Sequence, residues 1–396
     1  MGFKGLSRRD FLRTTGMVTA AAAMNGLPAE LFASGPRMAT FPEKRELILM
    51  TSRPPQLETP MHLFREMITP NDALFVRWHI ANIPTRVDLK EWRLKIGGNV
   101  DRALQLSMDD LKGFERISYT AVIQCSGNSR SFFEPRVAGG QWGNGAMGNV
   151  TWTGVRLKDV MQKAGIRAGS VDITFNGLDY GPIPTVPDLV KSLPVDKALE
   201  DDIMIAYEMN GAPLTMLNGF PARLVVPGWY ATYWVKSLSD ITVLTKTFEE
   251  FWMNPAYRIP DNDCGCVPPG STPKKTVPIN KMTTRSFVID PSADTVLVRD
   301  KPVEIMGIAF SGMHSVKDVI VSVDGGKTWG EARLGEDKGK YSWKQWFYPW
   351  KPTRPGSHTI MCRATNAIGE SQPFEKLWNP SGYLLNNVEK VAVTVR

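Results

Sequence analysis

One cysteine at the end of an apolar run is the side chain of this 396-residue sequence best placed to do chemistry. The run at residues 117–124 is rich in β-branched and aromatic side chains, which predicts a buried strand. A short turn at residues 126–128 follows, so Cys125 is expected at the strand's carboxyl end, where ligands often bind. Turn amides and the nearby Arg130 would bias its sulfur toward the thiolate, which binds metals or attacks electrophiles. Taken alone, Cys125 would more often be a buried structural cysteine.

The segment from Phe75 to His79 places charged side chains on one face of another expected strand. Alternation puts Phe75, Arg77 and His79 on one face, with Val76 and Trp78 on the other. A face that carries both an arginine and a histidine needs water, an anion or a metal beside it. A third segment, residues 218–236, predicts a strand between turns with cationic side chains before and after it. Each of these charges, taken alone, could be solvated or held in a salt bridge.

Several strings of residues together resemble the sulfite oxidase family of molybdenum enzymes. The matching strings are FVRWH, CSGNSR, QWGNGAMGNVTWTGVRL, YEMNGAPL, GFPARLVVPGW, WVK and VSVDGGKTW, and they follow the family's order over nearly the whole chain after residue 60. The first, second and fifth strings are specific when they occur together, although none is specific alone.

This resemblance implies a molybdenum ion held by one pterin dithiolene, with Cys125 as a further sulfur ligand. Thiolates are soft ligands that suit a redox-active transition metal, and the phosphate of the pterin needs cations and turn amides. The family's cofactor positions match Phe75, Arg77, His79, Ser126, Asp179, Arg223, Trp234 and Lys236. Asn218 stands where animal members carry a histidine, a change that keeps hydrogen bonding but not charge.

The resemblance also implies a small cationic substrate pocket. Arg77 and Arg130 would hold a dianionic oxyanion, Tyr257 would hydrogen-bond to it or to the metal's oxygen, and Trp142 would form a dry wall. Animal members place a further substrate arginine after a Trp-Asn-Leu string, whereas here Trp378-Asn379 is followed by Pro380-Ser381. Fewer charges, or another arginine, would therefore hold the oxyanion.

The implied function is that of a periplasmic sulfite dehydrogenase, which oxidises sulfite to sulfate and passes electrons singly to a c-type cytochrome. The chain has no C-x-x-C-H motif, so we expect no haem of its own. An exported methionine-sulfoxide reductase of the same fold is the main alternative, and plant-type nitrate reductase is a second. A periplasmic adhesion or binding protein would be a different class, but it leaves Cys125 and its arginine neighbours unexplained.

Composition and the first residues bear on location and partners. With 42% hydrophobic and 22% charged residues, the chain is ordinary for a soluble protein of two or three domains. Its net charge of +7 could favour an acidic partner, but no Lys/Arg-dense run suggests nucleic-acid binding.

No window of about 18 apolar residues predicts a membrane span. The string SRRDFL at residues 7–12, before an Ala-rich stretch, indicates a twin-arginine signal at 1–34 and export of the folded protein to the periplasm.

The order of predicted elements indicates a fold of α+β class. A molybdopterin-binding catalytic domain at residues 35–265 begins with an irregular stretch at 35–60, and 261–280 reads as a linker. Within it we expect strands at 92–97, 118–124, 171–175 and 222–226 and a helix at 157–164. Residues 266–396 are expected to form an immunoglobulin-like β-sandwich with strands at 303–310, 319–323, 343–348, 358–364 and 391–395. In the resembled family this sandwich makes a homodimer.

The other three cysteines form no metal-binding or haem motif. Cys264 and Cys266 are separated by one residue, so a bridge between them would close a strained loop and is not expected. Cys362 lies in a strand-like run and reads as a core residue. The chain has four histidines, which makes a His-rich metal site improbable.

Overall fold

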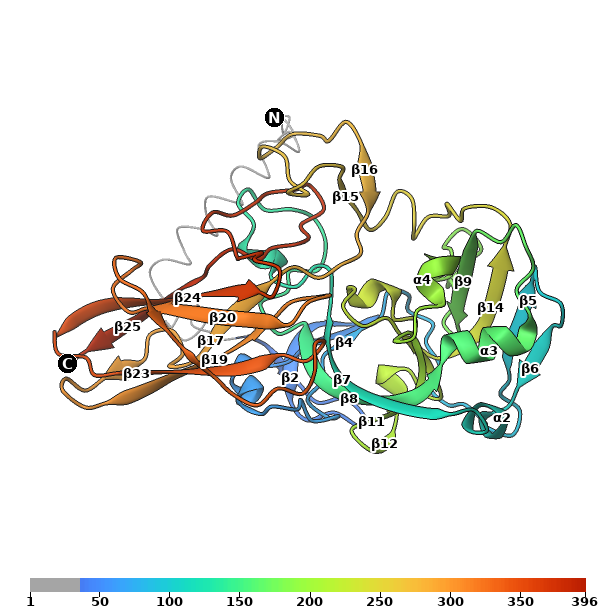
Figure 1. Ribbon diagram of the computed structural model, residues 1–396, viewed down its shortest axis with the longest axis horizontal. Coiled ribbons are helices and arrows are strands. Elements are labelled where there is room, and N and C mark those ends of the chain that lie inside the picture. The colour runs from blue at the N-terminus through green and yellow to red at the C-terminus, as the bar shows by residue number, and fades with distance from the viewer. Residues whose placement is uncertain (1–35) are drawn as a thin grey trace, which may run out of the picture. The chain divides into compact units, whose positions relative to one another are not determined.

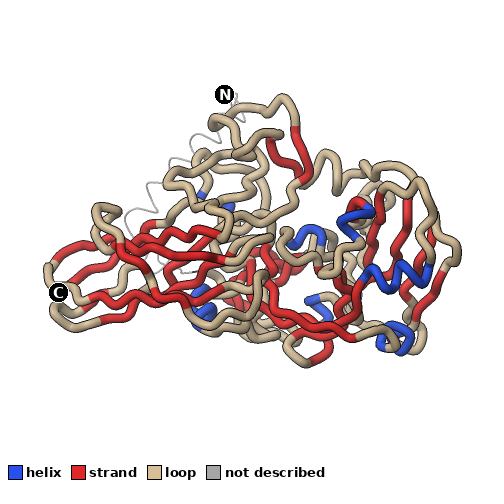
Figure 2. Tube along the Cα trace, viewed as in Figure 1, coloured by secondary structure: helices blue, strands red, loops and turns tan. Residues whose placement is uncertain are grey.

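The computed structural model describes residues 36–396, so the expected signal at residues 1–34 lies outside the described part. Strands dominate this part and the helices are few and short (Figures 1 and 2). The α+β expectation is therefore met only in part, because sheet makes up most of the regular structure. The one longer helix, α3 (Leu157–Ala164), has the expected bounds and buries Leu157, Val160 and Met161.

Two sheets and a few short helices build the part of the chain that contains Cys125. The first sheet has the order β10 (Lys191–Pro194), β9 (Asp172–Gly177), β14 (Leu238–Leu244), β5 (Leu94–Gly98) and β6 (Leu104–Leu106). The second has the order β12 (Ala212–Pro213), β11 (Met204–Met209), β8 (Met147–Arg156) and β7 (Arg116–Gln124), and β13 (Arg223–Val225) also pairs with β11. The short helices are α2 (Met108–Lys112), α4 (Val195–Ala198) and the 3-10 turns η2 (Met61–Arg65), η3 (Arg130–Phe132), η4 (Met216–Asn218) and η5 (Ala231–Tyr233).

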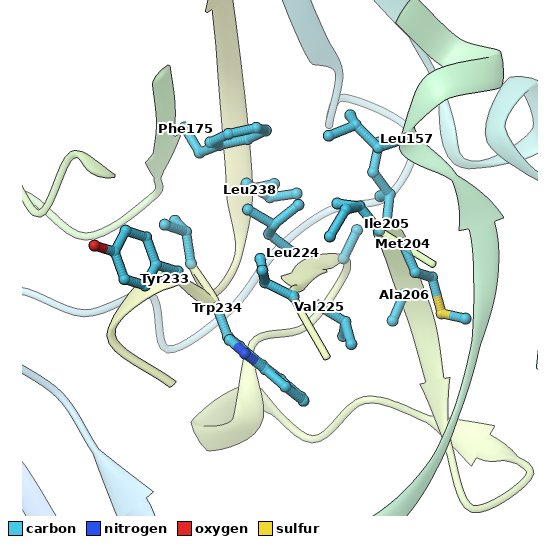
Figure 3. Close-up of a cluster of buried hydrophobic side chains, with 14 of the residues drawn as sticks. Leu157, Phe175, Met204, Ile205, Ala206, Leu224, Val225, Tyr233, Trp234 and Leu238 are labelled. Carbon is cyan, nitrogen blue, oxygen red and sulfur yellow. The ribbon is translucent and has the colours of Figure 1, made fainter. Parts of the chain in front are cut away.

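A continuous apolar core joins these two sheets. Phe175 of β9, Ile205 of β11 and Leu224 of β13 are fully buried, and Leu238 at the start of β14 packs with them (Figure 3). β7 and β8 pair antiparallel from Arg116 opposite Val155 to Gln124 opposite Met147. This long ladder fixes where β7 ends, and the residue that follows is Cys125.

The described part of the stretch expected to be irregular, residues 36–60, forms strands, contrary to expectation. β2 (Leu47–Ser52) and β3 (Pro55–Glu58) form an antiparallel hairpin, and β3 pairs with β4 (Val76–Arg77); β1 (Met38–Ala39) precedes them. The hairpin is stabilised by burial of Leu47 and Leu57 against Val76 and Trp78. Pro54 lies in the turn and Pro55 is the first residue of β3, positions at which a proline does not prevent pairing.

The C-terminal part is built from two facing sheets. One has the order β17 (Arg285–Asp290), β19 (Val303–Phe310), β23 (Lys344–Trp350) and β22 (Arg333–Leu334), and the other β18 (Val296–Leu297), β25 (Lys390–Val395), β24 (Gly356–Asn366), β20 (Val316–Ser322) and β21 (Gly330–Glu331). Side chains from both sheets share one core, in which Ile305, Trp346, Val319 and Ile360 are fully buried. All five strands expected from the alternating pattern are present, as β19, β20, β23, β24 and β25.

The expected linker contains more structure than its composition suggests. β15 (Arg258–Pro260) pairs with β16 (Thr276–Pro278), so the loop between them is held at both ends. Cys264 and Cys266 form a disulfide with a Cα–Cα distance of 5.1 Å, and the expectation that they would not pair is wrong. Gly265 between them has φ +56°, a conformation open to glycine, and this lets the short loop turn.

Candidate cofactor and substrate site

A pocket opens beside the carboxyl end of β7. It brings together residues that lie far apart in the sequence and includes most of the expected site residues. Those that line it are Phe75, Arg77, His79, Cys125, Ser126, Asn218, Arg223, Trp234, Lys236 and Tyr257. The alternation expected at 75–79 is confirmed, because Val76 and Trp78 point away into a separate apolar cluster.

Cys125 stands at the first position after β7, as expected. Its amide donates to the carbonyl of Ala146 at 2.9 Å, and its own carbonyl accepts from the amide of Asn128 at 3.0 Å. The first bond continues the pairing with the β8 side, and the second closes the turn that follows. Its thiol is not in a disulfide, and the side chain is 9% exposed. Cys362 is also free and buried, but it lies in the C-terminal core, as expected.

Arg223 is the most deeply held cation of the cavity. Its Nη1 donates to the carbonyl of Asn218 at 2.9 Å and its Nη2 to the carbonyl of Trp234 at 3.0 Å. The guanidinium lies 5.0 Å from the ring of Trp152, a cation–π distance. Burial lowers the pKa of Arg223 to about 9, which still leaves it cationic at neutral pH. No carboxylate is paired with it in the described structure, so its charge is available to an anion in the cavity.

Lys236 adds a second cation at the same wall. Its Nζ donates to the carbonyl of Arg77 at 2.9 Å and lies 4.4 Å from the ring of Trp78. Burial, helped by the positive charge of Arg223, lowers the pKa of Lys236 to about 7. Asp179 is buried nearby but does not line the cavity, and burial raises the pKa of its carboxyl to about 6, against the attraction of Lys236.

His79 and Tyr257 form a polar pair among the residues that line the cavity. The Nε2 of His79 and the phenol oxygen of Tyr257 are hydrogen-bonded to each other. Burial, together with the positive charges of Arg77 and Lys236, holds the pKa of His79 well below its usual value. Burial also raises the pKa of Tyr257, so the imidazole and the phenol are both neutral near pH 7. Tyr257 has φ +57°, a strained conformation of the kind that clusters at functional sites.

Several buried polar atoms around the cavity have no hydrogen-bond partner in the described structure. They are His79 Nδ1, Ser126 Oγ, Arg223 Nε and Thr232 Oγ1 on its walls, and Asp179 Oδ2 and Arg130 Nε close by. Buried polar groups in native proteins are normally satisfied, so a cluster of unsatisfied ones indicates a polar ligand. Basic side chains without a carboxylate partner, a free thiol and unsatisfied donors and acceptors fit an anionic pterin with a thiolate-bound metal.

Lys44 was not expected at the site and lies directly behind it. Its Nζ donates to Asn218 Oδ1 at 2.5 Å and to the carbonyl of Leu74 at 3.0 Å. Burial lowers the pKa of Lys44 to about 7. Asn218 stands at the position where animal relatives were expected to carry histidine. Its side-chain amide therefore has the amino group of Lys44 beside it. No motif in the sequence marks Lys44, because it is separated from Asn218 by more than 170 residues.

Arg130 and Trp142 do not line the cavity. Arg130 donates from Nη2 to the carbonyl of Ser381 at 3.1 Å and from Nη1 to that of Gly140 at 3.3 Å. Its guanidinium lies 5.0 Å from the ring of Tyr383, which stacks on Tyr257 at 5.7 Å. Trp142 is fully buried and packs edge-on against Phe75, with 6.5 Å between the ring centres. Both residues therefore support lining residues from behind.

The segment after Trp378-Asn379 packs against Arg130. The carbonyl of Ser381 accepts from Arg130, and Gly382 packs on the same side chain. A Cβ atom at Gly382 would lie 2.9 Å from Arg130 Nε, and one at Gly127 2.7 Å from its Nη1. Arg130 is thus enclosed by glycines, carbonyls and the ring of Tyr383. Tyr383 could not be found from sequence, because it belongs to no motif.

A buried ion pair ties the turn after Cys125 to the C-terminal sheets. Arg285, 2% exposed, donates from Nη2 to Glu389 Oε1 at 2.8 Å and to Ser129 Oγ at 2.7 Å. Asn144 Nδ2 also donates to Glu389 Oε2 at 2.8 Å. The loop that carries Cys125 is therefore anchored to β17 through side chains that the expected motifs do not include.

Two searches of the described residues, 36–396, gave negative results. None of the helices there has the length and apolar character needed to cross a membrane. Nor does that range contain a group of three or more His, Cys, Asp or Glu side chains placed to hold a metal ion.

Comparison with known proteins places these features in a family. The sequence matches the oxidoreductase molybdopterin binding domain over residues 80–252 and the Mo-co oxidoreductase dimerisation domain over residues 276–396. It also matches the twin-arginine translocation pathway signal sequence over residues 5–24. A solved structure, the sulfane dehydrogenase SoxCD from Paracoccus pantotrophus, superposes with a TM-score of 0.74 over 99% of this chain and 93% of that one. At 24% identity this likeness concerns the fold alone.

Two curated relatives are similar over most of the chain. Mitochondrial sulfite oxidase of Mus musculus is 34% identical over 367 residues, which cover 88% of this chain and 66% of that protein. Sulfite oxidase of Gallus gallus is 32% identical over 375 residues, which cover 90% of this chain and 80% of that protein. This chain thus spans just under two thirds of the length of the mouse relative. The chain belongs to the sulfite oxidase family of molybdopterin oxidoreductases, and its twin-arginine signal directs it to the periplasm.

Proposed function

We propose that the protein is a periplasmic sulfite dehydrogenase that oxidises sulfite to sulfate and passes electrons one at a time to a c-type cytochrome. The observation that carries this proposal is the cavity at the end of β7, where a free thiol meets unpaired cations and unsatisfied polar atoms. Sulfite and sulfate are dianions, and a cationic cavity lined by Arg77 suits them.

Cys125 is the proposed protein ligand of molybdenum, and the pterin is proposed to fill the rest of the cavity. Arg223 and Lys236 would bind its phosphate, because neither is paired with a carboxylate at hydrogen-bonding distance in the described structure. Ser126 Oγ and Asp179 Oδ2 lack partners and would bind the polar edges of the pterin. When bound, the molybdenum centre supplies oxygen transfer to sulfite and storage of the electron pair. Trp234 and Phe75 supply apolar walls that limit water access.

The His79–Tyr257 pair is proposed to fix a donor toward the bound anion. Because the pKa of Tyr257 is raised, its phenol keeps its proton and donates a hydrogen bond to Nε2 of the neutral imidazole. The imidazole proton is then on Nδ1, the atom that has no partner in the described structure. Arg130 would add positive charge from behind, through its contact with Tyr383.

The proposed assembly is a homodimer made through the C-terminal sheets, which we propose to be an immunoglobulin-like sandwich. The match of residues 276–396 to a dimerisation domain supports this assignment. The domain division proposed from the sequence, at residues 35–265 and 266–396, places the disulfide loop near the boundary.

The proposal is tested by assaying two reactions with the same purified holoenzyme. Sulfite-dependent reduction of ferricyanide is expected, with molybdenum and pterin present in equal amounts in the protein. Methionine sulfoxide reduction with an artificial donor should be absent or far slower. Sulfoxide reduction without sulfite oxidation would overturn the substrate assignment, and protein matured in its native host without molybdenum would overturn the cofactor assignment.

A further inference from the structure

An exposed apolar surface lies beside the cavity and is not used by the proposed chemistry. Tyr180 is 59% exposed, Ile183 57% and Phe251 48%. Exposed apolar side chains are ordinary when scattered, but these three belong to two segments that are joined to each other and to the site. We define residues 180–188 as the proline loop and this set of three side chains as the rim.

The proline loop lies between a residue buried near the cavity and a residue that lines the cavity. It follows Asp179, whose buried Oδ2 lacks a partner in the described structure, and it precedes Leu189, which lines the cavity. Its two ends are drawn together because the amide of Gly181 donates to Asp188 Oδ1 at 2.9 Å. The loop is thus held in place at the site while its tip stays exposed.

Trp252 joins the cavity to the rim. Its ring centre lies 5.2 Å from that of His79 and 6.3 Å from that of Tyr257, two residues that line the cavity. On its other side Phe251 packs edge-on at 4.9 Å, and the indole N–H donates to the carbonyl of Pro187 in the proline loop at 3.2 Å. Packed aromatic side chains therefore run without interruption from the cavity wall to the exposed Phe251.

The charge around the rim is opposite in sign to that of the whole chain. Residues 180–189 and 246–256 contain the exposed Glu249 and Glu250 and the half-buried Asp188 against one exposed lysine, Lys246, whereas the chain carries a net charge of +7. Lys191 is buried and Arg258 half-buried, and they donate to the carbonyls of Trp252 and Met253. An apolar centre with an acidic border complements a protein whose exposed prosthetic group is surrounded by lysines. Electron-transfer encounters are small and salt-sensitive, and a rim of three side chains is of that scale.

We propose that the rim is the docking surface for a c-type cytochrome with basic residues around its haem edge, and that Trp252 is the side chain between cofactor and partner. This inference rests on the proposed function. Each encounter transfers one electron from the reduced centre to a ferric haem, which becomes ferrous. Two encounters return the centre to its oxidised state for each sulfite oxidised.

The test compares Phe251→Ser and Ile183→Ser with Phe374→Ser, which removes an equally exposed phenylalanine from the C-terminal part. Equilibrium binding of a basic mitochondrial-type ferric cytochrome c to the holoenzyme is measured beside turnover with cytochrome c and with ferricyanide. Loss of a central apolar contact should weaken cytochrome binding on the order of ten-fold in the rim variants. Ferricyanide turnover should be unchanged, because this small acceptor needs no docking surface. Phe374→Ser should behave as the native protein.

A second set of measurements tests whether charge contributes to cytochrome binding. Binding of the basic cytochrome should weaken as salt rises, Glu249→Gln with Glu250→Gln should reduce that dependence, and an acidic c-type cytochrome should bind poorly. The docking proposal would be overturned if both rim variants bound the cytochrome as tightly as the native protein, or if Phe374→Ser lost as much affinity as they do. It would also be overturned if a rim variant changed only the oligomeric mass. Absence of ferricyanide turnover in the native protein would instead overturn the proposed function, and the binding measurement would still decide the surface.

Discussion

Cys125 illustrates what a single residue contributes at this site. Its position after β7 and the turn that follows were predictable, because strand pattern and turn residues are local signals. The cations on the cavity wall were identified by resemblance, and the structure brings them together. Lys44 and Tyr383 could not be predicted, because each reaches the site through contacts that join distant parts of the chain.

Replacing Cys125 with serine should nearly abolish sulfite turnover while the pterin stays bound. A serine oxygen is a harder ligand than a thiolate and would change the redox behaviour of the metal. Arg223 and Lys236 would still hold the pterin, because their positions depend on main-chain carbonyls rather than on the sulfur. Pterin content and the sulfite–ferricyanide assay measure the two effects. Native-like turnover in Cys125→Ser would remove this residue as the ligand.

Arg77→Gln and Arg130→Gln should both raise KM for sulfite, with the larger effect at Arg77. Loss of a charged hydrogen bond typically costs about 1.5–3 kcal/mol, or roughly ten- to a hundred-fold in binding. Arg77 lines the cavity, whereas Arg130 acts from behind Tyr383. Steady-state kinetics with ferricyanide give KM and kcat separately. An unchanged KM in both variants would mean that the substrate is bound elsewhere.

At the scale of elements, strands with a clear alternating pattern were predictable and contacts between distant segments were not. α3 and β19 have the expected bounds, since their apolar periodicity reports directly which face is buried. The β2–β3 hairpin was missed because prolines obscured its pattern, although Leu47 and Leu57 are fully buried. The Cys264–Cys266 bridge was rejected because spacing alone did not reveal the turn that Gly265 permits.

The ion pair between β17 and the loop before β25 should be important for stability. Glu389→Gln would leave Arg285 buried with its charge unpaired, and removal of one partner from a buried pair costs about 3–5 kcal/mol. Because Glu389 is 27% exposed, we expect the lower end of that range or less. Chemical denaturation measures the change. Glu304→Gln, at an exposed ion pair with Arg333, is the matched control and should change stability little. Equal stabilities of both variants would contradict the anchoring role of Arg285.

Lys191, the first residue of β10, should make stability depend on pH. Its Nζ is buried, donates to the carbonyl of Trp252 at 2.5 Å, and lies 5.0 Å from the ring of Tyr257. Burial lowers its pKa to about 7, whereas in the unfolded chain the pKa returns to its ordinary value. The unfolded state therefore binds more protons between these values, so the free energy of unfolding should rise as pH increases from about 7 toward about 10.

Lys191→Met should flatten this rise by at most about 1.4 kcal/mol per pH unit. Some rise should persist, because burial also lowers the pKa of Lys44 to about 7. Urea denaturation near neutral pH and at about pH 9 gives the comparison. The same pH dependence in the variant and the native protein would show that Lys191 does not carry the effect.

At the scale of the whole molecule, the order of the motifs along the chain and export to the periplasm were predictable from sequence. The contacts between the N-terminal sheets and the C-terminal sheets were not. The catalytic and C-terminal sheets each follow local patterns, but Ser381 and Tyr383 reach Arg130 only because the chain returns from the second part to the first. That return also places Glu389 against the turn that follows Cys125, through Arg285. The candidate site is therefore completed by both parts of the chain.

The central claim is that the cavity at Cys125 oxidises sulfite with water as the source of oxygen, and it is tested most directly by counting electrons. Holoenzyme, a limiting amount of sulfite and excess ferric cytochrome c are mixed without oxygen, and sulfate and ferrous cytochrome are both measured. Conversion of sulfite and water to sulfate releases two protons and two electrons, and each ferric cytochrome takes up one electron, so two cytochromes should be reduced for each sulfate formed. No sulfate, or cytochrome reduction that does not scale with sulfite, would contradict the account.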